Sequence, residues 1–172
     1  IQDERVTHAQ CDPGSEIPSL LTERDSSYPA LQILVAEDNE HTRFLVEAYC
    51  EKTPFALDMV ENGLEAVRAF ARKQYDVVLM DLQMPLLDGY SATRQIREYE
   101  RENGYPPVPI IAFSALVMQE NIHEALSAGC TSHLGKPIRQ QGLLDAIATA
   151  VGHHAPQAAE GTTAVAPASI PA

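Results

Sequence analysis

The sequence predicts an α/β fold in which helices cover both faces of a five-stranded, doubly wound parallel sheet. Two observations lead to this prediction. Short apolar stretches alternate with longer amphipathic stretches five times along the chain. The stretch VVLM at residues 77–80 holds four consecutive apolar residues, which is typical of a strand buried on both faces of a parallel sheet.

The five strands are bounded by turn signals and prolines. They are expected at residues 32–36, 56–60, 77–80, 110–113 and 132–134. The second strand ends shortly before Asn62 and Gly63, a pair typical of turns. Pro106, Pro107 and Pro109 prevent a helix before the fourth strand, because proline lacks the amide donor that a helix requires.

The helices are expected at residues 40–52, 65–72, 90–102, 119–128 and 139–151, the first of them capped by Asn39. Their predicted inward-facing residues include Phe44, Leu45, Ala48 and Tyr49 in the first helix and Ile122, Ala125 and Leu126 in the fourth. Arg97 is expected on the solvated outer face of the third helix.

Residues that can carry chemistry follow four of the predicted strands. They are Glu37 and Asp38 after the first, Asp81 after the third, Ser114 and Ala115 after the fourth, and Lys136 and Pro137 after the fifth. Right-handed crossovers bring the carboxyl ends of parallel strands to one edge of the sheet. That edge is where open α/β sheets place their ligands, so we expect these side chains to form one site.

The composition of this site favours phosphoryl chemistry. An aspartate after a strand often serves only as a turn former or helix cap, so the prediction depends on the whole set. Three neighbouring carboxylates repel one another unless a cation is bound or their pKa values rise. A hard cation such as Mg²⁺ binds carboxylates and phosphate oxygens alike. A hydroxyl at Ser114 and an ammonium at Lys136 could then stabilise phosphoryl oxygens while a carboxylate attacks phosphorus.

The chain resembles receiver domains of the two-component response-regulator family, and is most similar to the receivers of hybrid sensor histidine kinases. Four motifs carry the resemblance, in this order between residues 31 and 151: LVAEDN, VVLMDLQMPLLDG, IIAFSA and HLGKPI. The resemblance implies that Asp81 takes a phosphoryl group from a phosphohistidine on a histidine kinase or histidine phosphotransfer domain. It also implies that Mg²⁺ is held by Glu37, Asp38, Asp81 and the backbone carbonyl of Gln83.

The resemblance assigns further roles and a strand order. It implies that Ser114, Ala115 and Lys136 bind the phosphoryl group and that the peptide before Pro137 is cis, which proline permits at little cost. His133 stands at the family's switch position, which is usually aromatic. The implied strand order is the flavodoxin-like 2-1-3-4-5.

Outside the motifs, the sequence predicts a linker or disordered lead-in at residues 1–30, the receiver domain at 31–151 and a disordered tail at 152–172. The chain carries 24 acidic against 12 basic residues, a formal charge of −12, which disfavours binding to nucleic acid or anionic membranes. No signal peptide or membrane span is evident, and three cysteines without paired spacing indicate a reducing compartment. We expect a cytoplasmic domain, either free or tethered to a membrane sensor kinase.

Several functional alternatives remain open at this stage. The chain begins with Ile1 and has no room for an output module, so we expect a segment of a hybrid kinase, with a stand-alone regulator as the alternative. Such a segment phosphorylates itself without turnover, whereas the parent would be a protein-histidine kinase. A receiver scaffold without phosphorylation is a further alternative. A haloacid dehalogenase-type phosphatase is disfavoured because Gln83 stands where that family has a second acid, and a Rossmann domain because no glycine-rich loop follows the first strand.

Overall fold

The computed structural model of the chain describes residues 28–115 and 119–154, the side chains of residues 153 and 154 excepted. The strands are β1 (Gln32–Ala36), β2 (Ala56–Val60), β3 (Val77–Asp81), β4 (Ile110–Ser114) and β5 (Ser132–Gly135). The helices are α1 (Glu40–Cys50), α2 (Gly63–Arg72), α3 (Gly89–Asn103), α4 (Gln119–Ala128) and α5 (Gln140–His154). Each expected element is present, and strands β3, β4 and β5 each extend one residue further than expected.

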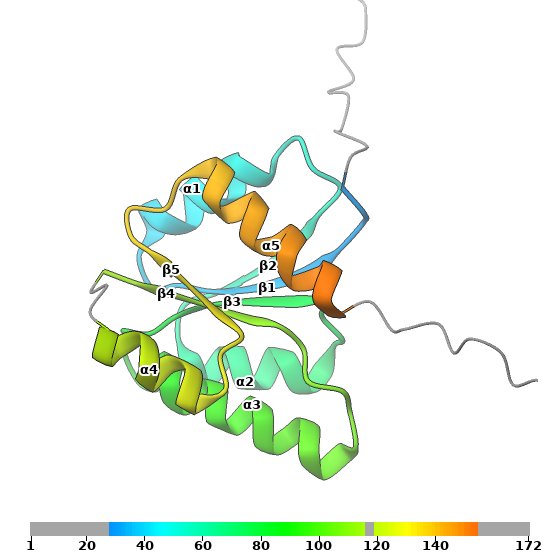
Figure 1. Cartoon of the computed structure of the whole chain (residues 1–172), viewed down its shortest axis with the longest axis vertical. Coiled ribbons are helices and arrows are strands. Elements are labelled where there is room, and N and C mark those ends of the chain that lie inside the picture. Colours follow the sequence, from blue (N-terminus) through cyan, green and yellow to red (C-terminus); the bar gives the residue numbers. More distant parts are fainter. Residues whose placement is uncertain (1–27, 116–118, 155–172) are drawn as a thin grey trace, which may run out of the picture.

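The sheet is parallel throughout, in the order β2-β1-β3-β4-β5, which confirms the predicted fold class. Helices α1 and α5 cover one face and α2, α3 and α4 cover the other (Figure 1). The strand register pairs Asp81 with Phe113 and Ser114 with Gly135. The carboxyl ends of the central strands therefore meet at one edge.

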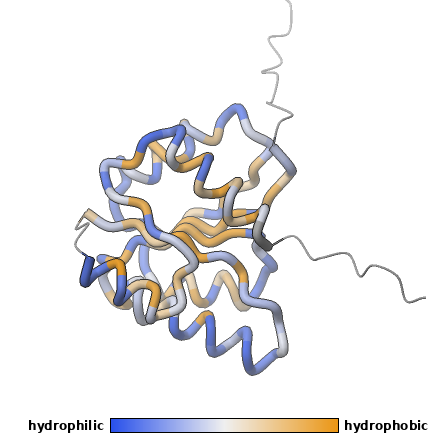
Figure 2. Tube along the Cα trace, viewed as in Figure 1, coloured by the Kyte–Doolittle hydropathy of each residue, from blue (hydrophilic) through white to orange (hydrophobic). Residues whose placement is uncertain are grey.

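Two hydrophobic clusters lie on the two faces of the sheet. Leu34 and Ala36 of β1 belong to the cluster beneath α2, α3 and α4, whereas Ile33 and Val35 belong to the cluster beneath α1 and α5. All residues of β3 are buried, as expected for the central strand of a doubly wound sheet. Apolar residues gather along the strands and polar residues along the outer helical surfaces (Figure 2). Burying each large aliphatic side chain contributes about 1.5–3 kcal/mol.

The inward faces of two helices differ from the prediction. In α1, Val46 and Cys50 are buried, whereas Ala48 is exposed and Phe44 is 71% exposed. In α4, Ala125 and Ala128 are buried and Leu126 is 47% exposed. Val46 and Cys50 in α1 lie four residues apart, and Ala125 and Ala128 in α4 lie three apart, so each pair shares one helix face, which packs toward the sheet. In α4 both buried residues are alanines, whose small side chains allow a close approach.

Arg97 does not lie on a solvated face, which corrects the prediction for α3. Its Nε donates to the carbonyl of Gly129 at 2.9 Å, and its Nη1 donates to Glu100 Oε2 at 2.6 Å. Glu100 is itself buried and accepts a second hydrogen bond from the amide of Val108 at 2.7 Å. The long side chain of Arg97 can follow the surface and reach a buried acid, which a charge count along the helix does not show.

Most of the predicted lead-in and tail lie outside the described residues, namely at 1–27 and 155–172. Helix α5 continues three residues beyond its predicted end at residue 151. Within the part of the chain that the structure describes, no helix has the length and apolar content that crossing a membrane requires.

Candidate functional site

Three carboxylates converge at the carboxyl edge of the sheet. Asp81 ends β3, and Glu37 and Asp38 directly follow the neighbouring β1. One carboxylate oxygen from each residue lies within 4.8 Å of the other two. Glu37 and Asp81 are buried, and Asp38 is exposed. The structure therefore brings these three acids together, as the sequence predicts.

Lys136 reaches the same cluster from the loop after β5. Its Nζ lies 2.8 Å from Glu37 Oε2 and donates to Asp81 Oδ2 at 2.9 Å. Burial acts to lower the pKa of Lys136, but the two carboxylates outweigh burial and raise it. The ammonium is therefore held in its charged form between two acids.

The surroundings of Glu37 raise the pKa of its carboxyl. Burial raises the pKa of its carboxyl, and the charge of Asp81 adds to this, while the contacts with Lys136 oppose it. Oε1 accepts a hydrogen bond from the Asn39 amide at 3.1 Å. Oε2 is buried and pairs with the ammonium of Lys136 at 2.8 Å. Both oxygens of this buried carboxylate thus have a partner, one in the Asn39 amide and the other in the Lys136 ammonium.

This donor set fits a hard divalent cation. Three carboxylates whose oxygens lie within 4.8 Å of one another match the oxygen ligands that Mg²⁺ prefers. Asp38 is exposed, so one side of the cluster is open to solvent. A carboxylate that is both buried and faced by a cation can act as a nucleophile toward phosphorus.

The loop after β3 fixes the orientation of Asp81. Its Oδ1 accepts a hydrogen bond from the Gln83 amide at 3.1 Å. The amide of Gly89 donates to the Leu82 carbonyl at 3.1 Å, which closes the loop against the end of the strand. A Cβ at Gly89 would lie 2.0 Å from the Asp81 carbonyl oxygen. Only glycine allows α3 to begin this close to the acid.

The remaining predicted residues surround Asp81 at differing depths. Ser114 is buried at the end of β4, and its carbonyl accepts from the Lys136 amide at 2.8 Å. Ala115 is exposed directly after it. The peptide between Lys136 and Pro137 is cis. Ser114 thus ends β4, and Ala115, Lys136 and Pro137 lie in the segments that follow β4 and β5.

His133 lies in β5, where it pairs with Ala112 of β4. Its Nε2 is buried without a hydrogen-bond partner in the described part of the chain. Burial lowers the pKa of the imidazole, which favours its neutral form. The residue that the sequence analysis assigned to the switch position is thus a partly buried ring at the edge strand of the sheet.

Arg43 is a residue of this region that the sequence prediction missed. Its Nη1 donates to the backbone carbonyls of Glu37 and Asp38 at 2.8 and 2.9 Å. The signal in the sequence is weak, because it consists of one arginine in the first turn of the helix that follows the paired acids. Hydrogen bonds from a side chain to the backbone leave no periodic pattern.

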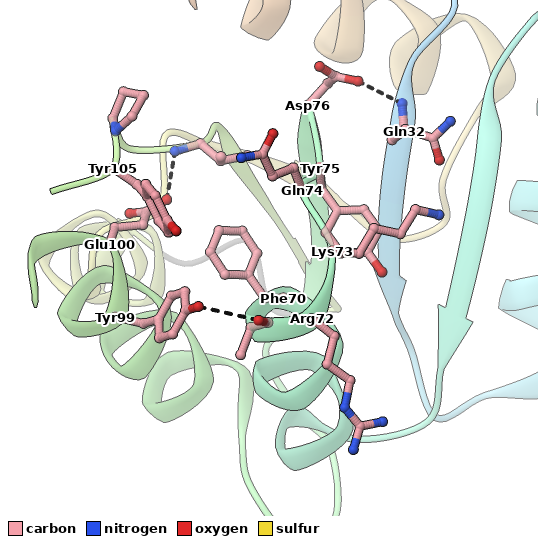
Figure 3. A pocket seen from close by; sticks show the side chains of 13 residues that line it. Gln32, Phe70, Arg72, Lys73, Gln74, Tyr75, Asp76, Tyr99, Glu100 and Tyr105 are labelled. Carbon is pink, nitrogen blue, oxygen red and sulfur yellow. Dashed lines mark hydrogen bonds between the residues drawn. The ribbon is translucent and has the colours of Figure 1, made fainter. Parts of the chain in front are cut away.

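A cavity of about 540 Å³ lies at the opposite edge of the sheet (Figure 3). Aromatic rings of Phe70, Tyr75 and Tyr99 line it. Gln32, which begins β1, also lines the cavity, and its backbone amide donates to Asp76 Oδ2 at 2.7 Å. Because it lies where the strands begin, this cavity is separate from the acid cluster where they end.

Comparison with known proteins agrees with this geometry. Residues 33–148 match the family of response regulator receiver domains. The chain is 40% identical over 114 residues to the peroxide stress-activated histidine kinase mak1 of Schizosaccharomyces pombe, covering 64% of this chain and 7% of that protein. It is 37% identical over 122 residues to hybrid signal transduction histidine kinase A of Dictyostelium discoideum, covering 70% and 6%. The chain thus spans less than a tenth of either relative.

Solved structures give the same result. The receiver domain of sensor histidine kinase PA1611 from Pseudomonas aeruginosa PAO1, which holds a magnesium ion in its active site cleft, is 36% identical with a TM-score of 0.65. The match covers 72% of this chain and 99% of that one. The Saccharomyces cerevisiae Ssk1 receiver domain, crystallised with the histidine phosphotransfer protein Ypd1, is 30% identical with a TM-score of 0.71, covering 74% and 93%.

Proposed function

This chain belongs to the response regulator receiver family, and we propose that Asp81 is the residue on which it receives the phosphoryl group. It is a receiver domain of a two-component phosphorelay and is similar to the receivers of hybrid histidine kinases. One observation carries the proposal. The buried carboxylate of Asp81 is contacted by the ammonium of Lys136 at 2.9 Å and lies within 4.8 Å of two further acids.

In the proposed reaction, a carboxylate oxygen of Asp81 attacks the phosphorus of a phosphohistidine on a partner. A P–O bond to Asp81 forms as the P–N bond breaks, and the imidazole nitrogen keeps the electron pair and takes up a proton. In this proposal Lys136, which contacts Asp81, would neutralise charge on a phosphoryl oxygen, and Ser114 would donate a hydrogen bond to another.

Mg²⁺ is the proposed cofactor. Glu37, Asp38, Asp81 and the carbonyl of Gln83 would hold it. When bound, it would neutralise the charges that gather on the acids and the phosphoryl oxygens. The three clustered carboxylates and the related receiver with magnesium in its cleft support this proposal.

The proposed parent is a hybrid sensor histidine kinase, and the proposed partner is a histidine kinase or histidine phosphotransfer domain. The similar relatives are named as histidine kinases many times longer than this chain, and one similar receiver was crystallised with a phosphotransfer protein. We place the receiver at residues 31–151, flanked by 1–30 and 152–172, in a cytoplasmic part of the parent. We propose that the segment itself binds neither nucleic acid nor membrane.

Intact mass spectrometry tests the assignment of Asp81. We expect one phosphoryl adduct, labile to hydroxylamine, when the protein is incubated with Mg²⁺ and acetyl phosphate. Asp81→Asn should show none, because an amide does not attack phosphorus. Asp88→Asn is the matched control, because Asp88 caps α3 through the Ser91 amide and asparagine caps equally well.

Two outcomes would contradict the proposal. An adduct of equal yield on Asp81→Asn would move the phosphoacceptor to another residue. Failure of the wild type to form an adduct, either with acetyl phosphate or with a phosphorylated histidine phosphotransfer domain, together with failure to bind Mg²⁺, would favour a receiver that serves only as a protein-binding scaffold.

A further inference from the structure

We infer that Arg43 is a positioning residue that holds the two acids after β1 in the arrangement that binds metal. The inference rests on the proposed function, because it concerns the Mg²⁺ site. Glu37 and Asp38 belong to a short loop between β1 and α1, and their side chains can converge on Asp81 only if the loop backbone is fixed. Arg43 is the side chain that fixes it.

The contacts of Arg43 form a bridge between three parts of the chain. Nη1 donates to the carbonyl of Glu37 at 2.8 Å and to the carbonyl of Asp38 at 2.9 Å. Nη2 donates to Glu61 Oε1 at 2.9 Å, just after β2. The side chain is only 17% exposed. The guanidinium therefore binds Glu61 on one side and, on the other, the loop that contains Glu37 and Asp38.

The loop depends on Arg43 because its other hydrogen bonds do not involve the carbonyls of Glu37 and Asp38. The Glu37 amide donates to the Val60 carbonyl, and the Asn39 carbonyl accepts from the Arg43 amide. These bonds hold the two ends of the loop, whereas Arg43 holds the peptide groups between them. Fixing both carbonyls fixes the direction in which the two carboxylates leave the backbone.

The guanidinium combines a positive charge, which pairs with Glu61, with several N–H donors in one plane. Lysine would keep this charge, but a single ammonium cannot reproduce the planar fork that bonds the loop and Glu61 together. Arg43→Lys therefore separates the effect of position from the effect of charge.

Isothermal titration of the chain with Mg²⁺ tests the inference. Substitutions beside a metal's ligands typically weaken metal binding by about 10–100-fold, and we expect a loss in this range for Arg43→Ala. Arg43→Lys should recover only part of the affinity. Arg68→Ala is the matched control, because Arg68 is an exposed arginine of α2, and we expect its affinity to stay within about twofold of the wild type.

A second measurement needs no metal. Amide hydrogen exchange of Glu37, Asp38 and Asn39, followed by NMR with EDTA present, should accelerate in Arg43→Ala and Arg43→Lys but not in Arg68→Ala. A role confined to global stability would instead accelerate exchange throughout the sheet. Should Arg43→Ala fail to fold, Arg43→Lys is sufficient for both measurements.

The two measurements also separate this inference from the proposed function. If the wild type binds no Mg²⁺, the proposed cofactor is wrong, and hydrogen exchange alone decides the role of Arg43. If the wild type binds Mg²⁺ and both Arg43 variants bind it within about twofold, with unchanged exchange in the loop, the inference is overturned while the proposed function stands.

Discussion

The Nζ of Lys136 lies 2.9 Å from Oδ2 of Asp81, although 55 residues separate the two in the chain. The same nitrogen lies 2.8 Å from Glu37 Oε2. The site is therefore preorganised around a cation that the chain itself supplies. This leads to separate expectations for Lys136, the proposed contact of the phosphoryl group, and for the acids, the proposed metal ligands.

Lys136→Arg should slow phosphorylation much more than it weakens metal binding. A guanidinium keeps the charge, but it is too broad to replace an ammonium between two carboxylates. We expect Mg²⁺ affinity within a few-fold of the wild type. The phosphorylation rate with acetyl phosphate should fall on the order of a hundredfold, as when one charge-stabilising donor is removed from an active site. An unchanged rate would show that Lys136 does not contact the transferred group.

Glu37→Gln should stabilise the metal-free protein at neutral pH. Because the pKa of Glu37 is raised above its ordinary value of 4.5, the folded protein binds this proton more tightly than the unfolded chain. The contribution of this group to the free energy of unfolding therefore falls as pH rises through 4.5, and it stays reduced at pH 7. Urea denaturation in EDTA should show a gain of about 1 kcal/mol at pH 7 that vanishes near pH 4.

Magnesium should make the wild type more stable than Glu37→Gln. At a concentration 100 times its dissociation constant, a ligand that binds only the folded state adds about 2.7 kcal/mol. We expect this gain in the wild type and in Glu47→Gln, which alters an exposed acid of α1 away from the cluster. Glu37→Gln should gain much less. Equal stabilisation of all three proteins would place the metal elsewhere.

His133 should make the fold sensitive to mild acid. Burial lowers its pKa below the ordinary value of 6.5, so the unfolded chain binds the proton more readily. The free energy of unfolding should therefore fall by up to about 1 kcal/mol as pH decreases from 7.5 to 5.5. His133→Gln should remove this dependence, whereas His123→Gln, at an exposed position of α4, should keep it. A pH dependence shared by both variants would exclude His133 as its source.

Glu100→Ala should be strongly destabilising. Both oxygens of this buried carboxylate are in use, one by Arg97 and the other by the amide of Val108. Removing them leaves the part-buried amide of Val108 without its hydrogen bond and the guanidinium of Arg97 without its ion pair, which costs about 3 kcal/mol. Glu98→Ala is the matched control in the same helix, because its pair with Arg101 is exposed and contributes at most about 0.5 kcal/mol. Similar denaturation midpoints for the two variants would refute the expectation.

The strand ends could be predicted from the sequence, and the contacts between loops could not. Unbroken apolar stretches leave little choice about where β1, β3 and β4 lie, and parallel topology then brings Glu37, Asp81 and Ser114 together. The face of α1 was harder to predict because apolar residues occur around most of the helix, so the choice between Phe44 and Val46 depends on packing.

The roles of Arg43 and Glu100 have a different origin. Each satisfies backbone groups that lie far from it in the chain or outside any periodic element. The segment before β4 is rich in proline, which lacks an amide proton, so the amide of Val108 needs a partner from elsewhere. Such needs become visible only when the backbone path is known.

Gly89→Ala tests how closely α3 can begin beside Asp81. The added Cβ would lie 2.0 Å from the Asp81 carbonyl oxygen and 2.8 Å from Leu82 Cα, so either the end of β3 or the start of α3 must shift. Overpacking of this kind costs about 1–3 kcal/mol, and a shift of Asp81 should also slow its phosphorylation. Gly142→Ala is the control, because nothing lies within 4 Å of its Cβ in α5, and alanine should add up to about 1 kcal/mol of helix stability there. If Gly89→Ala matched the wild type in both denaturation midpoint and phosphorylation rate, the close approach of α3 to Asp81 would be disproved.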